Sequence, residues 1–200
     1  MKTDNIRSII AHEMGHAIVG EILDSEYEPT TITLRSTKGE AGRAACNFNT
    51  TGEYGNTSLP TIRRLHNLID LGGIFGELIL NGEWSPWGAS YDLEDFVGVN
   101  IESRGKLITE LFNWMYNDED DQSYFDLIRK EKDIIGKRNT TLTWNDTRTR
   151  LPQLWEVYLD FVGKIDIKNF KDVVVEIEKG SEKEISKARL NRYMKRIVRS

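Results

Sequence analysis

The segment HEMGH, residues 12–16, constrains this chain more than any other feature of its sequence. His12 and His16 are four positions apart, so on a helix both side chains leave one face, one turn apart. That spacing lets two imidazole nitrogens reach one tetrahedral zinc ion at about 2.0–2.1 Å. Glu13 would then lie beside the metal, where it can accept a proton from zinc-bound water and pass it to a leaving amine. The segment predicts a helix that binds one zinc ion per chain and carries a general base.

The residues around this segment suit a buried metal-binding helix. Thr3 or Asp4 can cap a helix over residues 3–24, and isoleucines recur in it near helical spacing. Gly15 and Ala17 are small residues beside the two histidines. The alternative, two surface histidines that share a helix face by accident, does not explain these apolar and small neighbours.

The rest of the chain is predicted to be mainly α-helical, with a small β-hairpin or sheet. β-Branched alternation predicts a strand at 30–36, and a turn at 38–40 leads to a second strand at 43–48. Apolar spacing predicts helices at 3–24, 60–80, 90–116, 123–136, 147–164, 167–179 and 182–199.

The predicted helix 60–80 has an unusual composition. Gly72, Gly73 and Gly76 would each cost up to about 1 kcal/mol in an exposed helix. Such small residues are better explained by a second helix that approaches closely. Glu77 lies among them, and a buried carboxylate needs a partner. We therefore expect Glu77 near the metal site, either as a ligand or as a residue that supports one.

An acidic break at residues 117–122 is the best candidate boundary within the chain. It separates residues 1–118, predicted to form a zinc peptidase core, from residues 119–200. This second part is predicted to be a helical C-terminal region that packs on the core.

Composition limits the partners and the compartment. The chain is 38% hydrophobic and 30% charged, which is ordinary for a soluble globular protein. Its net charge of -5 argues against nucleic acid as a partner, and no apolar stretch is long enough to cross a membrane. The single cysteine, Cys46, excludes an internal disulfide framework and is expected to be a small buried hydrophobe. We expect a soluble cytoplasmic protein, in which the remaining histidine, His66, packs or lies at the surface.

Four segments occur in the order AHEMGHAIVGEIL, TTITLRS with GRAA, LIDLGGIFGELILNG and GASYDLED, within residues 6–115. They resemble, in turn, the HEAGHA metal helix, the following strand pair, the LGGRAAEEL-x-x-G helix and the GASNDL segment of FtsH-type zinc peptidases. These are the proteolytic domains of membrane-anchored AAA proteases. The resemblance implies an FtsH-like zincin fold with extra C-terminal helices. It also implies a zinc metalloendopeptidase that acts on a peptide or unfolded protein.

The resemblance also implies a third zinc ligand. Asp92 matches the aspartate of GASNDL, the residue that completes the zinc site of the family. From the sequence alone, Asp92 is equally an acid at the start of a helix, favoured there by the helix dipole. Glu77 is the alternative third ligand, although in the resemblance it falls at an acidic position that supports a zinc histidine.

A substrate-binding edge is predicted in the first strand. HExxH peptidases commonly align an extended substrate along a sheet edge, and the residues that would form it are Thr31, Ile32, Thr33 and Leu34. An ordinary strand packed on the metal helix is the alternative. Trp84 and Trp87 either line a substrate pocket or cover the core.

The chain departs from the family in one major respect. It contains no G-x-x-x-x-G-K-[ST] loop, so it carries no ATPase of its own. We therefore expect an ATP-independent activity, or one that depends on a separate ATPase or adaptor, and leave the oligomeric state open. Two alternatives remain: a catalytically silent zinc-binding regulatory or interaction module of the same fold, and a dedicated protease effector that cuts one host protein.

Overall fold

The computed structural model describes residues 3–22, 27–34, 44–50, 59–85, 141–150, 152–181 and 183–199. Over these residues the chain is mainly helical with a small antiparallel sheet, as the sequence predicts. The predicted helices 90–116 and 123–136 and the predicted boundary at 117–122 lie outside the described residues.

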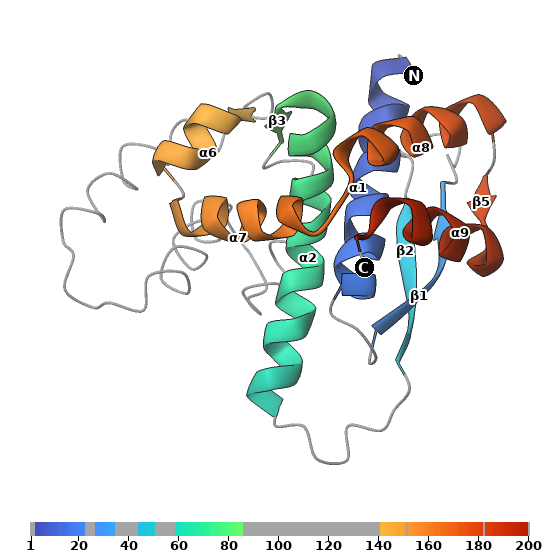
Figure 1. Cartoon of the computed structure of the whole chain (residues 1–200), viewed down its shortest axis with the longest axis horizontal. Coiled ribbons are helices and arrows are strands. Elements are labelled where there is room, and N and C mark those ends of the chain that lie inside the picture. Colours follow the sequence, from blue (N-terminus) through green and yellow to red (C-terminus); the bar gives the residue numbers. More distant parts are fainter. Residues whose placement is uncertain are drawn as a thin grey trace, which may run out of the picture.

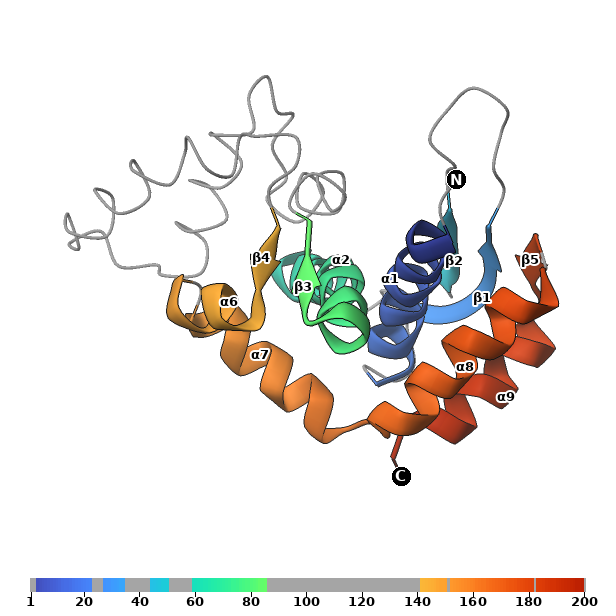
Figure 2. The ribbon, with the colours of Figure 1, turned by 90° about the horizontal axis from the view of Figure 1, so that it is seen from above.

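Helix α1, which carries the HEMGH segment, is the central element (Figure 1). Helix α2 packs along one side of it, the sheet along another and helix α8 along a third, an arrangement that Figure 2 shows from above. The described elements are α1 (Thr3–Ile22), β1 (Tyr27–Thr33), β2 (Ala45–Thr50), α2 (Leu59–Asn81), β3 (Glu83–Trp84), β4 (Leu142–Thr143), α6 (Trp144–Arg150), α7 (Pro152–Gly163), α8 (Ile167–Gly180), β5 (Glu184–Ile185) and α9 (Lys187–Ile197).

The central position of α1 explains its composition. Ala11, Ala17 and Val19 are all buried, at most 5% exposed, although they point in different directions around the helix. A helix that is apolar on most sides is stable in water only when other elements cover those sides. Helix α2, the sheet and α8 provide this cover.

The sheet has the strand order β2-β1-β5, with both pairs antiparallel. The β1–β2 pair confirms the predicted hairpin, with Ile32 opposite Cys46. The register shifts between Pro29 and Thr31. Pro29 has no backbone N–H to donate to a neighbouring strand. Ile185 of β5 pairs with Ile32 on its other side.

Two predicted helices are corrected by the structure. The helix predicted at 147–164 is two helices, α6 and α7, and Pro152 begins the second. Proline disfavours helical geometry in the residue before it but suits the first turn of a helix. The helix predicted at 182–199 begins only at Lys187, because Glu184 and Ile185 extend the sheet as β5. Pairing with β1 overrides the local helical pattern there.

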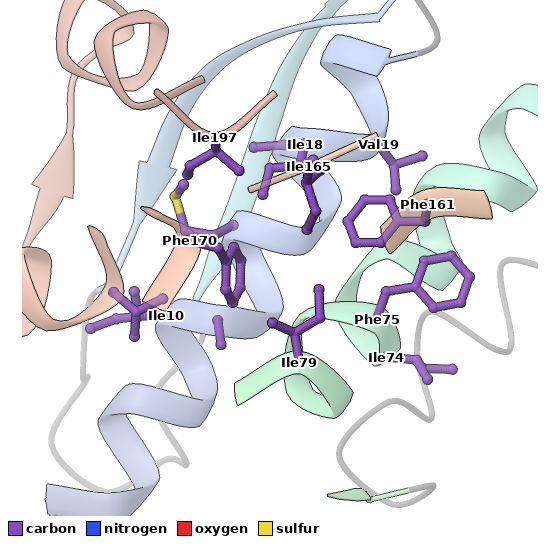
Figure 3. Packing of buried hydrophobic residues seen from close by; sticks show 14 of the residues in the cluster. Ile10, Ile18, Val19, Ile74, Phe75, Ile79, Phe161, Ile165, Phe170 and Ile197 are labelled. Atoms are coloured by element: carbon purple, nitrogen blue, oxygen red, sulfur yellow. The ribbon is translucent and has the colours of Figure 1, made fainter. Parts of the chain in front are cut away.

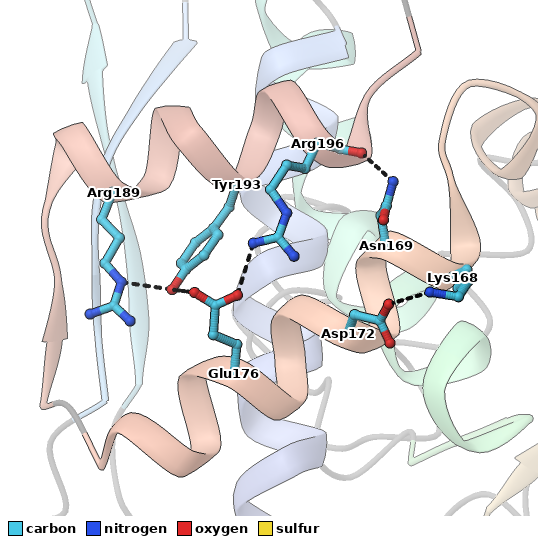
Figure 4. A network of polar contacts seen from close by, with 7 residues as sticks. All are labelled: Lys168, Asn169, Asp172, Glu176, Arg189, Tyr193 and Arg196. Atoms are coloured by element: carbon cyan, nitrogen blue, oxygen red, sulfur yellow. Dashed lines mark hydrogen bonds and ion pairs between the residues drawn. The ribbon is translucent and has the colours of Figure 1, made fainter.

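Helices α8 and α9 are joined by a polar network (Figure 4). Glu176 accepts hydrogen bonds from the Tyr193 hydroxyl, at 3.2 Å, and from Arg196, at 2.8 Å. Arg189 donates to the same hydroxyl at 2.6 Å, and Asn169 donates to the backbone oxygen of Arg196 at 2.9 Å. Burial is the main cause that raises the pKa of Tyr193. The network fixes how the C-terminal helices pack on one another.

One hydrophobic core joins the N-terminal and C-terminal elements (Figure 3). Phe170 of α8 is completely buried among side chains that include Ile10 and Ile18 of α1. Phe161 of α7 packs on Phe75 of α2 with 5.2 Å between ring centroids. Within the described residues, no helix is both long and apolar enough to cross a membrane.

Candidate metal centre

Helices α1 and α2 approach each other at glycines, as the sequence predicts. A β-carbon at Gly72 would lie 2.6 Å from the backbone oxygen of Gly15, too close for two real atoms. A β-carbon at Gly15 or at Gly76 would collide with backbone of the opposite helix, at Gly72 and at Ala11 respectively. The two backbones therefore touch, and this contact brings the α2 residues beside the HEMGH segment.

Gly73 makes room for the first histidine. A β-carbon at Gly73 would lie 2.5 Å from Nε2 and 2.7 Å from Nδ1 of His12. The imidazole ring therefore occupies the volume that any other residue at position 73 would fill. The sequence predicted that this glycine lets a second helix approach. In the structure, its missing side chain leaves room for the imidazole ring of His12.

The carboxylate of Glu77 contacts the Nδ1 atom of His12. Its Oε1 atom lies 2.7 Å from Nδ1 of the histidine, and both side chains are largely buried. Its Oε2 atom accepts a hydrogen bond from the backbone N–H of Ser85 at 3.2 Å. An ionised carboxylate can only accept, so Nδ1 of His12 carries the proton in this pair.

His16 is oriented in the same way by a backbone group. Its Nδ1 atom lies 2.6 Å from the carbonyl oxygen of Ile69 on α2. A carbonyl oxygen accepts and never donates, so Nδ1 of His16 carries the proton. In a neutral ring the lone pair is then on Nε2. Both histidines of the motif are thus held through the same nitrogen, Nδ1, and metal-ligating histidines are typically oriented by such second contacts.

The imidazole rings of His12 and His16 are in contact. Their centroids are 4.8 Å apart, with 79° between the ring planes. His16 and Glu13 are each only 7% exposed, so the motif forms a largely buried group on α1. This burial excludes the interpretation of HEMGH as a pair of surface histidines.

Helix α1, which carries Glu13, contacts strand β2. Burial raises the pKa of the Cys46 thiol well above its usual value, and the negative charge of Glu13 raises it further. Cys46 lies opposite Ile32 and packs against the core, but it is partly buried rather than buried as the sequence predicts.

The described residues do not supply a third ligand for a metal at the two histidines. In the part of the chain that the structure describes, no group of three His, Cys, Asp or Glu side chains could hold a metal ion. Asp92, the predicted third ligand, lies outside that part. Glu77 binds Nδ1 of His12, on the side of the ring away from Nε2. This geometry favours Glu77 as the support of a ligand over Glu77 as a ligand.

The predicted substrate edge is not open in β1. Ile32 and Thr33 pair with β2 on one side and with β5 on the other, and the N–H of Leu34 donates to Lys183. The prediction from sequence missed β5, which is short and distant in the chain. Among the described strands, β2 is the one beside α1 that pairs on a single side. Thr31, in the same predicted edge, pairs with Asn47 of β2.

Trp84 belongs to the core rather than to a pocket. It is 2% exposed, and its indole N–H donates to the hydroxyl of Thr147 at 3.0 Å. Trp87 lies outside the described residues.

Neither a family model nor a curated protein matches this chain. The inference about function therefore depends on the residues of the site and on the sequence resemblance described above.

Proposed function

We propose that the chain is a zinc metalloendopeptidase with an FtsH-like fold extended by C-terminal helices. One observation carries the proposal: both histidines of an HExxH helix have Nδ1 at hydrogen-bond distance from acceptors on α2, which favours Nε2 of each ring as the atom that would bind a metal. Glu77 and the carbonyl of Ile69 are the acceptors. Two imidazoles fixed in this tautomer are a donor set that suits zinc.

His12 and His16 would hold the metal, and Asp92 is proposed as the third protein ligand. Zinc bound there would polarise the peptide carbonyl and make hydroxide available near neutral pH. Glu13 is proposed to accept the proton of the attacking water and to return it to the leaving amine. The burial of Glu13 beside the two histidines supports this role.

The substrate would bind as an extended segment along β2. This strand pairs with β1 on one side in the described residues, and it contacts helix α1, which carries Glu13. Backbone hydrogen bonds to a strand edge accept many sequences but require an extended chain. The proposal therefore names flexible peptides and unfolded proteins as the substrate class.

The proposal is tested with purified protein, added zinc and a fluorescently labelled unstructured protein. Wild type should cleave it, whereas Glu13→Gln should bind zinc equally and lose cleavage. His12→Ala should lose both, and His66→Ala, the one histidine outside the motif, should retain both. Equal cleavage by wild type and Glu13→Gln would reject the mechanism. Zinc binding without cleavage by wild type would instead support the silent binding module.

A further inference from the structure

A short segment far along the chain reaches the metal centre through backbone pairing. Ser85, whose N–H holds Glu77, directly follows strand β3. Strand β3 pairs antiparallel with β4, so that Glu83 is opposite Thr143 and Trp84 is opposite Leu142. The β4 residues are 58 positions or more away from β3 in sequence. The donor that holds the Glu77 carboxylate, the Ser85 N–H, therefore follows a two-stranded sheet whose second strand, β4, comes from the C-terminal region.

Buried side chains hold this small sheet in place. Trp84 donates to Thr147, which is completely buried and in turn donates to the carbonyl of Thr143 at 2.9 Å. The N–H of Trp144 donates to the carbonyl of Gly82 at 2.9 Å, and its indole donates to the carbonyl of Leu78 at 2.8 Å. The second contact adds a donor to a carbonyl in the last turn of α2, which also accepts from the backbone N–H of Gly82 at 3.0 Å.

The start of helix α6 is itself fixed. Thr143 and Asp146 cap it reciprocally: the hydroxyl of Thr143 accepts from the Asp146 N–H at 3.2 Å, and the Asp146 carboxylate accepts from the Thr143 N–H at 3.0 Å. This is a capping box, which defines where a helix begins. Thr147, one turn into the helix, is therefore presented to Trp84 from a rigid support.

We propose that residues 142–147 are a positioning element of the metal centre. They hold β3, so that the Ser85 N–H fixes the Glu77 carboxylate against Nδ1 of His12. The inference rests on the proposed metal role of His12, but the hydrogen bond at Nδ1 exists without the metal. The C-terminal region is thereby part of the site, although it lies beyond the segments that resemble the peptidase family.

The physical reason is that a ligand must be held in orientation as well as in place. Removing a group that orients a metal-binding histidine typically weakens metal affinity by about 10- to 100-fold. Glu77 can rotate about its own side-chain bonds if one oxygen loses its contact. The Ser85 N–H restricts this rotation, and it does so only while β3 remains paired with β4.

The experiment compares Thr147→Val with Thr149→Val. Both threonines lie in α6 and donate to the carbonyl four residues earlier, and Thr147 alone of the two accepts the Trp84 indole. Two quantities are measured: the nitrogen-15 NMR signal of the His12 Nδ1–H in metal-free protein, and zinc affinity by competition with a chelator. We expect Thr147→Val to shift or broaden the His12 signal and to weaken zinc binding about tenfold, at the lower end of the range for such supports. Thr149→Val should change zinc affinity less than about twofold.

The proposal is overturned if the two variants give the same His12 signal and the same zinc affinity. If wild type binds no zinc, the proposed function fails, whereas the NMR comparison still decides whether residues 142–147 position His12. If Thr147→Val does not fold, Trp84→Phe removes the same hydrogen bond from the other partner. An unchanged His12 signal in folded Trp84→Phe would then overturn the proposal.

Discussion

The Oε1 atom of Glu77 lies 2.7 Å from Nδ1 of His12, across 65 positions of sequence and between two helices whose backbones touch. The contact and the glycines depend on one another. Side chains at Gly72 or Gly76 would force the helices apart, and Glu77 would then move away from the histidine. The glycines of α2 therefore allow Glu77 to orient the side chain of His12 on α1.

Glu77→Gln should weaken zinc binding without abolishing it. The amide oxygen can still accept from Nδ1–H of His12, but an uncharged oxygen is a weaker acceptor and makes Nε2 a weaker ligand. The amide NH2 group also cannot accept from the Ser85 N–H. We expect about a tenfold loss of zinc affinity at unchanged stoichiometry, measured by chelator competition. Glu83→Gln, an exposed acid in β3, is the control. If stoichiometry falls to zero, Glu77 is a ligand rather than a support.

The sequence predicts the parts of this site that depend on local pattern. The spacing of His12 and His16 predicts their shared helix face, and the glycines of α2 predict a close helix. The acceptor for His16 is a backbone carbonyl, at Ile69, and every residue carries one, so no residue type marks it. Sequence could not identify it.

The missed strands have a similar explanation. Strands β3, β4 and β5 each contain two residues, too few for an alternating pattern to be visible. They form because a distant segment offers backbone partners, as when Ile185 pairs with Ile32. Their effect on the site is large: β5 closes the side of β1 that sequence had predicted to be open, and β3 places the Ser85 N–H.

Gly73→Ala should disturb the site more than it disturbs the fold. The new methyl group would overlap the His12 ring, and overpacking of this kind costs about 1–3 kcal/mol. We expect the free energy of unfolding to fall by that amount and zinc affinity to fall as the ring is displaced, measured by denaturant titration and chelator competition. Gly163→Ala, where a β-carbon meets nothing within 4 Å, is the matched control and should be neutral or stabilising. Equal zinc affinity in the two variants would contradict the space assigned to the ring.

Phe170→Ala should destabilise helix α1 although the substitution is in α8. Phe170 is completely buried in the core that α8 shares with α1, and such a truncation costs about 3–5 kcal/mol. We expect faster hydrogen exchange in α1 and α8 alike, because the elements share one core. Leu159→Ala, at a side chain that is 50% exposed, should change stability by no more than about 0.5 kcal/mol. Faster exchange confined to α8 and α9 would show that the two regions unfold independently.

Cys46 should react slowly with alkylating reagents, and Glu13 should contribute to this. The thiolate is the reactive form, and burial first, then the negative charge of Glu13, raises the pKa of the thiol. The midpoint of the pH–rate profile should therefore lie above about 8.5, the value of a free thiol. Glu13→Gln removes the charge and should move that midpoint to lower pH.

The rate of alkylation by iodoacetamide is followed by mass spectrometry. Because the chain has one cysteine, the modification reports on Cys46 alone. Denatured protein, which should titrate as a free thiol, is the control. A midpoint that does not move in Glu13→Gln would show that the carboxylate is not close to β2, and would remove the support for placing the substrate along that strand.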